Sequence, residues 1–74
     1  MADHIVDTRG RQCPMPVIKL SQAITSAQPG YTIELISTDH GSCSDVPAWA
    51  DDTGHTLKEQ FETESEFHFV LVKS

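Results

Sequence analysis

The stretch Asp7–Lys19, DTRGRQCPMPVIK, organises the chain because it joins a short strand to a helix through a loop that contains Gly10. Cys13 lies between this loop and Pro14, and a proline suits the first turn of a helix, where its missing N–H costs little. A helix N-terminus carries unpaired N–H groups and a positive partial charge, and both favour a thiolate over a thiol. Since the thiolate is the reactive form of cysteine, the stretch predicts thiol chemistry at Cys13.

Four strands are predicted, over residues 4–8, 31–37, 55–62 and 66–73. Ile5 and Val6 form the centre of the first run, and the second and fourth runs alternate in the manner of a strand. The last run is apolar on both faces, which indicates a central strand or an outer face that meets a partner. The first helix should run to about Gln28, where Pro29-Gly30 stops it. A second helix should begin near Cys43–Asp45 and end at Gly54.

The resulting order is βαβαββ, and right-handed crossovers place both helices on one face of the sheet. The fold class predicted for residues 1–74 is therefore α/β, a two-layer sandwich with a mixed four-stranded sheet in a single domain. Helical periodicity assigns a buried face to the first helix, with Pro16, Val17, Leu20, Ala23, Ile24 and Ala27. In the second helix it buries Val46, Trp49, Ala50 and Thr53 and turns outward Asp45, Asp51 and Asp52.

The chain carries a net charge of −6, from eleven acidic and five basic residues. This balance argues against direct binding of nucleic acid, which requires clustered Lys and Arg. The sequence has no apolar run near the roughly 20 residues of a membrane span and no secretory leader at its start, so we expect a cytoplasmic protein without membrane contact. Three of the basic residues lie close to Cys13 in sequence: Arg9, Arg11 and Lys19.

Cys43 is the second of two cysteines, and its spacing from Thr38 repeats the spacing of Cys13 from Thr8. If the first two strands are parallel, both cysteines emerge at one sheet edge, where open α/β sheets place their sites. The simpler interpretation makes Cys43 a near-cap residue without chemistry; the alternative makes it a second thiol that receives or resolves sulfur. His40 and Cys43 lack the further ligands of a zinc site, so no metal is expected.

The pattern Asp7-x-x-Gly10-x-x-Cys13-Pro14-x-Pro16, with Lys19 one turn later, resembles the signature of the TusA-like (SirA-like) sulfur-carrier family. The specific match covers roughly residues 5–20, and the rest agrees in length, element order and the Pro-Gly break before the second strand. Arg11 departs from the family, which usually has an aliphatic residue after the glycine. The resemblance implies a βαβαββ fold and a persulfide carrier in which Cys13 accepts sulfane sulfur and passes it on.

This role implies a sulfurtransferase without metal or organic cofactor. Its partners would be a persulfide-donating protein, such as a cysteine desulfurase or a rhodanese-like protein, and a sulfur-accepting protein. The family serves tRNA thiolation, cofactor sulfuration and oxidative sulfur metabolism. Met15 and Ile18, outward-facing apolar residues near Cys13, are candidates for docking these partners, and Lys19 for stabilising the persulfide or meeting an acidic group. Asp7 is expected to fix the loop by accepting backbone N–H bonds, while Arg9, Gly10 and Arg11 would form a cationic loop.

Two alternatives belong to other functional classes. A dithiol redox protein would use Cys13 and Cys43 in a reversible disulfide and would lose its activity without either cysteine. A non-catalytic interaction or regulatory module would keep the motif for docking and would tolerate loss of the Cys13 thiol.

Overall fold

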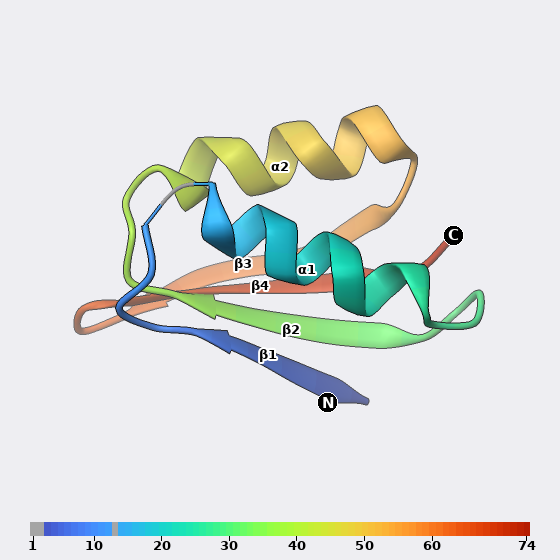
Figure 1. Ribbon diagram of the computed structural model, residues 1–74, viewed down its shortest axis with the longest axis horizontal. Coiled ribbons are helices and arrows are strands. Elements are labelled where there is room, and N and C mark those ends of the chain that lie inside the picture. Colours follow the sequence, from blue (N-terminus) through green and yellow to red (C-terminus); the bar gives the residue numbers. More distant parts are fainter. Residues whose placement is uncertain (1–2, 13) are drawn as a thin grey trace.

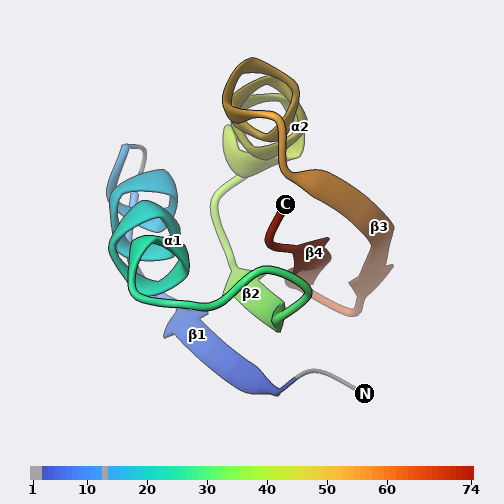
Figure 2. The same ribbon diagram turned by 90° about the vertical axis from the view of Figure 1, so that its right-hand side faces the viewer.

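A computed structural model describes residues 3–12 and 14–74, and Cys13 lies outside the described residues. The elements follow the predicted order (Figure 1): β1 (His4–Thr8), α1 (Met15–Thr25), β2 (Thr32–Ser37), α2 (Ser42–Thr53), β3 (Thr56–Thr63) and β4 (Glu66–Val72). Both helices lie on one face of the sheet (Figure 2), which confirms the predicted two-layer α/β architecture. No helix in the described part of the chain has the length and apolarity to span a membrane.

The sheet has the strand order β1-β2-β4-β3. β1 and β2 are parallel, whereas β4 is antiparallel to both of its neighbours, so the sheet is mixed as predicted. β4 is central, and this position explains its apolar residues: Phe67, Phe69 and Leu71 are buried beneath the helices, and Val70 on the other face is only 9% exposed. A strand with a neighbour on each side needs no partner protein to complete its hydrogen bonds.

The core lies between the sheet and the two helices. Its buried apolar residues are Leu20, Ile24, Ile33, Leu35, Val46, Ala50, Phe67, Phe69 and Leu71. Pro16 is fully buried too, and Val17, Ala23, Ala27 and Trp49 pack partly buried against the core, in agreement with the predicted helix faces. α1 is thereby seated over β1 and β2, with its N-terminal end fixed by Pro16.

α1 ends at Thr25, so the prediction that it reaches Gln28 was wrong. The Ile24 carbonyl accepts a hydrogen bond from the Ala27 N–H at 3.1 Å, which tightens the last turn, and another from Lys73 Nζ at 2.8 Å. The proline that follows Gln28 also disfavours a helical conformation at that residue. A basic side chain at a helix C-terminus satisfies carbonyls and complements the dipole, and here it comes from the far end of the chain.

α2 begins at Ser42 and ends before Gly54, whose φ of +82° gives the left-handed cap. Two residues differ from the predicted helix faces. Thr53 is exposed, and its hydroxyl donates to the Trp49 carbonyl at 2.7 Å instead of packing inward. Asp45 is half-buried, whereas Asp51 and Asp52 are exposed as predicted. Asp45 lies in the first turn of α2, at the end of the molecule where this helix begins.

Candidate functional site

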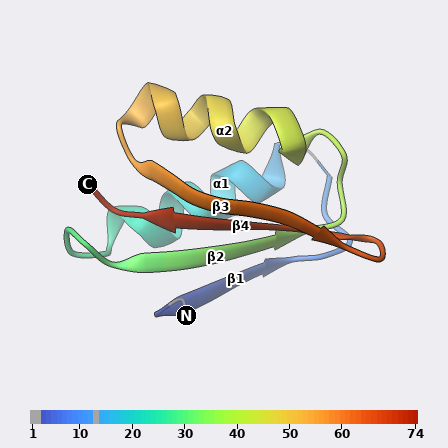
Figure 3. The same cartoon turned by 180° about the vertical axis from the view of Figure 1, so that it is seen from behind.

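The candidate site lies where several elements begin or end together. Figures 1 and 3 place the C-terminal ends of β1 and β2, the starts of both helices and the β3–β4 turn at the same end of the molecule. This is the edge predicted from parallel β1 and β2, and Gln12 and Pro14, the chain neighbours of Cys13, belong to the segment that crosses it. Both helix N-termini direct positive dipole ends towards this edge.

The segment after β1 is shaped by Gly10 and by hydrogen bonds at its base. Gly10 has a φ of +80°, a left-handed backbone conformation that residues with a Cβ rarely adopt. Its N–H donates to Thr38 Oγ1 at 2.9 Å, and the Arg11 N–H donates to the Thr8 carbonyl at 3.1 Å. The loop after β1 is thus tied both to its own strand and to the loop after β2. The sequence alone indicated no role for Thr38, whose spacing from Cys43 only repeats that of Thr8 from Cys13.

Buried hydroxyl groups hold the strand ends beneath this loop. Thr8 Oγ1 donates to the Ile36 carbonyl at 2.6 Å, which adds a side-chain bond to the β1–β2 pairing. Ser37 Oγ and Ser42 Oγ are 2.7 Å apart, and Ser37 Oγ also accepts the Asp39 N–H at 3.1 Å. Since these hydroxyls are paired, β2 and the start of α2 form a fixed base for the site.

The two prolines of the motif have different structural roles. Pro14 is the N-cap of α1 and not a residue of its first turn, while Pro16 occupies that turn and is fully buried. The Met15 N–H donates to the Gln12 carbonyl at 2.9 Å, and prolines have no N–H to offer. The start of α1 therefore has fewer free N–H groups than a helix start without prolines.

Arg9 and Asp7 form a close ion pair. The Asp7 carboxylate accepts the Arg9 backbone N–H and Nε–H at Oδ1, both at 3.0 Å, and Nη2–H at Oδ2 at 2.6 Å. Asp7 thus accepts a backbone N–H, as expected. Its hydrogen bonds from the Arg9 side chain lower the pKa of the Asp7 carboxyl from 3.8 to about 2. Because the Arg9 guanidinium is paired with this carboxylate, Arg9 does not provide the open positive charge that a cationic loop would require.

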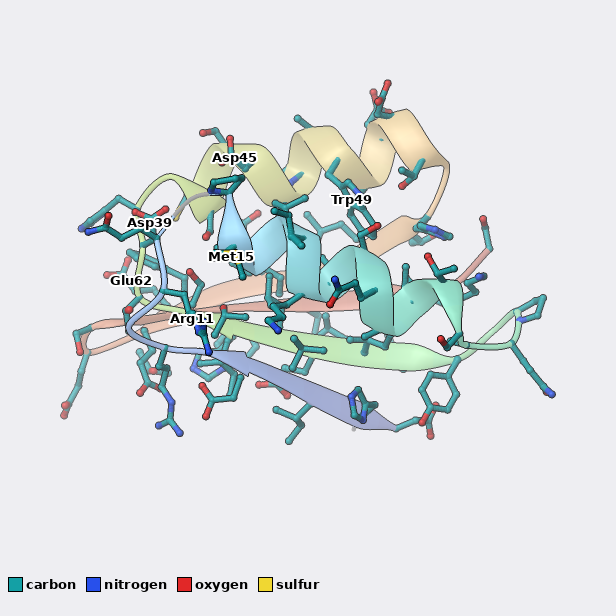
Figure 4. All side chains as sticks on the ribbon, in the orientation of Figure 1. Arg11, Met15, Asp39, Asp45, Trp49 and Glu62 are labelled. Atoms are coloured by element: carbon teal, nitrogen blue, oxygen red, sulfur yellow. The ribbon has the colours of Figure 1, made fainter. Side chains whose placement is uncertain are left out.

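Arg11 remains exposed, and acidic side chains gather at the same end. Figure 4 shows Arg11, Met15, Asp39, Asp45 and Glu62 around the starts of the helices, with Trp49 farther along α2. This end of the molecule is therefore of mixed charge, with Arg11 and the carboxylates of Asp39, Asp45 and Glu62. Lys19 is half-buried farther along α1, and within the described residues its ammonium group makes no hydrogen bond or ion pair.

Met15 and Ile18 lie on the outer side of α1, as predicted. Ile18 is 40% exposed, among the most exposed large apolar side chains of the described residues, and Met15 is half-buried. They offer an apolar surface within the first turns of α1 that the core does not use.

Cys43 lies in the first turn of α2 as a free, half-buried thiol packed against the core. Burial raises its pKa, and the carboxylates of Glu62 and Asp39 raise it further. The thiol form therefore dominates at neutral pH, which suits the structural interpretation of Cys43 better than a reactive one. His40 packs edge-on against Phe67, with ring centroids 4.9 Å apart, and the described residues contain no group of three or more His, Cys, Asp or Glu arranged to hold a metal ion.

The fold matches a solved structure of similar size. The crystal structure of a SirA-like protein from Desulfitobacterium hafniense superimposes with a TM-score of 0.83 at 21% identity, covering 93% of this chain and 95% of that one. At this identity the match establishes the fold alone.

Sequence relatives establish the family. The chain is 35% identical over 72 residues to the sulfur carrier protein TusA of Allochromatium vinosum, covering 97% of this chain and 95% of the relative. It is 32% identical over 71 residues to TusA of Pseudomonas syringae pv. tomato, with 96% and 84% covered. The family model described as "Sulfurtransferase TusA" matches residues 4–73. The chain therefore belongs to the TusA family, and its role is that of a sulfur carrier in a sulfur relay.

Proposed function

We propose that Cys13 is the residue that carries the sulfur, as a persulfide, and that this domain of residues 1–74 acts as a sulfurtransferase between two proteins. The family match over residues 4–73 carries the proposal, because it includes the whole motif around Cys13. The positions of Asp7, Gly10 and Pro16 support it, since they shape a loop that leads from a parallel strand to a helix N-terminus.

The chemistry is an exchange between a thiolate and a persulfide. The Cys13 thiolate attacks the outer sulfur of a donor persulfide, R–S–SH; a new S–S bond forms at Cys13, the S–S bond of the donor breaks, and the donor leaves as R–S⁻. The products are Cys13–S–SH and the donor thiolate, so atoms and charge balance without a cofactor. In the second half of the cycle, a thiolate of the acceptor attacks the outer sulfur and Cys13 leaves as its thiolate.

Both steps require that the sulfur reach the active site of another protein. We propose a cysteine desulfurase or a rhodanese-like protein as donor and a sulfur-accepting protein of tRNA thiolation, cofactor sulfuration or oxidative sulfur metabolism as acceptor. Ile18 and Met15 would dock these partners, because apolar side chains exposed beside a reactive group contribute strongly to transient interfaces. A reducing cytoplasm is the compartment that keeps the Cys13 thiol available for loading.

Mass spectrometry after incubation with glutathione persulfide tests the proposal. The intact protein should gain the mass of one sulfur or more, and the added sulfur should map to the peptide that contains Cys13. Cys13→Ser should abolish the gain, while the matched variant Cys43→Ser should keep it. A wild-type protein that gains no sulfur from glutathione persulfide or from a loaded cysteine desulfurase would contradict the proposal.

A further inference from the structure

Arg9 contacts a second carboxylate in addition to that of Asp7. Its Nη1 donates to Glu66 Oε2 at 3.3 Å, and Glu66 is the first residue of β4, 57 positions later in the chain. Nε and Nη2 of the guanidinium therefore donate to the two oxygens of Asp7 as a fork, and Nη1 donates to Glu66. Such a fork fixes the orientation of an arginine side chain, which a lysine could not reproduce.

The contact between Arg9 and Glu66 spans β2. In the register of the sheet, Thr8 of β1 lies beside Ser37 of β2, and Ser37 lies beside Phe67 of β4. Arg9, Thr38 and Glu66 are each one residue beyond this row, at the end where the β1–α1 loop begins. The hydrogen bond from the Gly10 N–H to Thr38 Oγ1 likewise joins the loop after β1 to the residue that follows β2. The start of the loop is thus held to both of the next two strands.

Glu66 is itself held on the open face of the sheet. Its Oε1 lies 3.6 Å from Nε2 of His68, whose Nδ1 lies 2.8 Å from Glu34 Oε2 on β2. The His68 ring stacks on Phe61 of β3, with ring centroids 4.8 Å apart and an interplanar angle of 3°. The carboxylate that receives Arg9 therefore belongs to a row of side chains anchored on three strands.

We propose that Arg9 and Glu66 form a clamp that positions the Cys13 loop, with both acting as positioning residues for sulfur transfer. This inference rests on the proposed function of Cys13. Arg9 connects Asp7, at the end of β1, to β4, and the loop between Arg9 and Pro14 is then short enough that fixing its first residue restricts the whole segment. Loss of the clamp should let the segment between Arg9 and Pro14 sample other conformations.

The effect should be local, because the side chains are partly solvent-exposed: 53% for Arg9, 46% for Asp7 and 30% for Glu66. Exposed ion pairs contribute little to global stability, so variants of the clamp should remain folded. Glu66→Gln also separates positioning from simple electrostatics. Removing a negative charge would by itself lower the pKa of the Cys13 thiol, whereas a loosened loop would raise this pKa by making the orientation proposed for the thiol towards the helix N-terminus less constant.

Three measurements on Arg9→Gln and Glu66→Gln test the clamp. Amide hydrogen exchange at Gly10 should accelerate by about tenfold in each variant, because the loop opens more often. The pH dependence of Cys13 alkylation by iodoacetamide, resolved by peptide mass spectrometry, should show a raised thiol pKa, and sulfur uptake from glutathione persulfide at neutral pH should slow by about threefold or more. The double variant should be no worse than Arg9→Gln alone, since that substitution already removes the contact between Arg9 and Glu66.

Glu59→Gln is the matched control for Glu66→Gln. Glu59 lies on β3 and is exposed, and its side chain makes no hydrogen bond or ion pair with the described residues, so its neutralisation should leave all three measurements at wild-type values. Wild-type exchange at Gly10 in both clamp variants, or a lowered Cys13 pKa in Glu66→Gln, would overturn the clamp. Failure of the wild-type protein to accept sulfur would instead contradict the proposed function, and hydrogen exchange would still decide whether the clamp exists.

Discussion

The Gly10 N–H donates a hydrogen bond to Thr38 Oγ1 across the ends of two parallel strands, at 2.9 Å. This bond connects the loop that leads to Cys13 with the loop that leads to α2. Thr38→Val removes the acceptor at nearly constant volume and should lower the free energy of unfolding by about 1 kcal/mol or less. Amide exchange at Gly10 should accelerate at the same time. Thr38→Ser keeps the hydroxyl and should stay close to the wild type; equal losses in both variants would show that the bond does not hold the loop.

Gly10→Ala tests the conformation of the loop itself. A Cβ built on Gly10 meets nothing within 4 Å, so the variant has no steric clash and its cost comes from the φ of +80° alone. We expect a loss of about 1 kcal/mol in unfolding free energy, measured by chemical denaturation. Gly10→Asn should lose less, because asparagine tolerates the left-handed region. An unfolding free energy of Gly10→Ala equal to that of the wild type would show that the loop can adopt another conformation.

Leu20 and Ile18 offer a paired test of the two sides of α1. Leu20 is fully buried, and Leu20→Ala should cost about 3 kcal/mol of unfolding free energy through lost burial and the cavity left behind. Ile18 is 40% exposed, and Ile18→Ala should cost less than about 1 kcal/mol. Denaturation midpoints measure both variants. Similar losses would mean that Ile18 belongs to the core and is not available for docking.

The ion pair of Asp7 makes stability depend on acid pH. The pKa of Asp7 is lowered to about 2 in the folded protein, from 3.8. The contribution of Asp7 is therefore fully present above pH 3.8 and is lost as the pH falls through about 2. Asp7→Asn removes this contribution, so the difference in unfolding free energy between wild type and variant should shrink as the pH falls from about 5 to about 2. Urea denaturation at each pH measures this difference. A difference in unfolding free energy that stays constant with pH would mean that folding does not shift the pKa of Asp7.

Cys43 should react slowly, because burial and nearby carboxylates raise its pKa. With iodoacetamide at neutral pH, peptide mass spectrometry should show alkylation at Cys13 well before Cys43, and the difference should narrow as the pH rises. Cys43→Ser should retain sulfur uptake at Cys13. Activity that requires both cysteines would instead support the dithiol redox alternative.

Local patterns in the sequence predicted most of the fold. The alternation of apolar residues placed the strands within about a residue or two at most ends, and helical periodicity assigned Leu20, Ile24, Val46 and Ala50 to the core. These signals are strong because burial of one face is the main constraint on each element. The motif likewise indicated the end of the sheet at which the candidate site lies.

Contacts between distant residues were not predictable in this way. Arg9 was assigned to a cationic loop because its neighbours in sequence gave no sign of Glu66, which β4 brings beside it. At the end of α1, the Ile24 carbonyl accepts a hydrogen bond from Lys73, 49 positions later in the chain. Asp45 fits an outward face by periodicity, but in the structure it is half-buried. Periodicity does not encode such contacts between residues far apart in the chain.

The strand order β1-β2-β4-β3 has a consequence for folding during synthesis. β4 is made after the other three strands, yet it lies between β2 and β3 and supplies Glu66 to the loop after β1. A nascent chain that has emerged only as far as β3 can pair β1 with β2 but cannot join β3 to them. The loop after β1 should therefore reach its final geometry only after β4 has left the ribosome and Glu66 can meet Arg9.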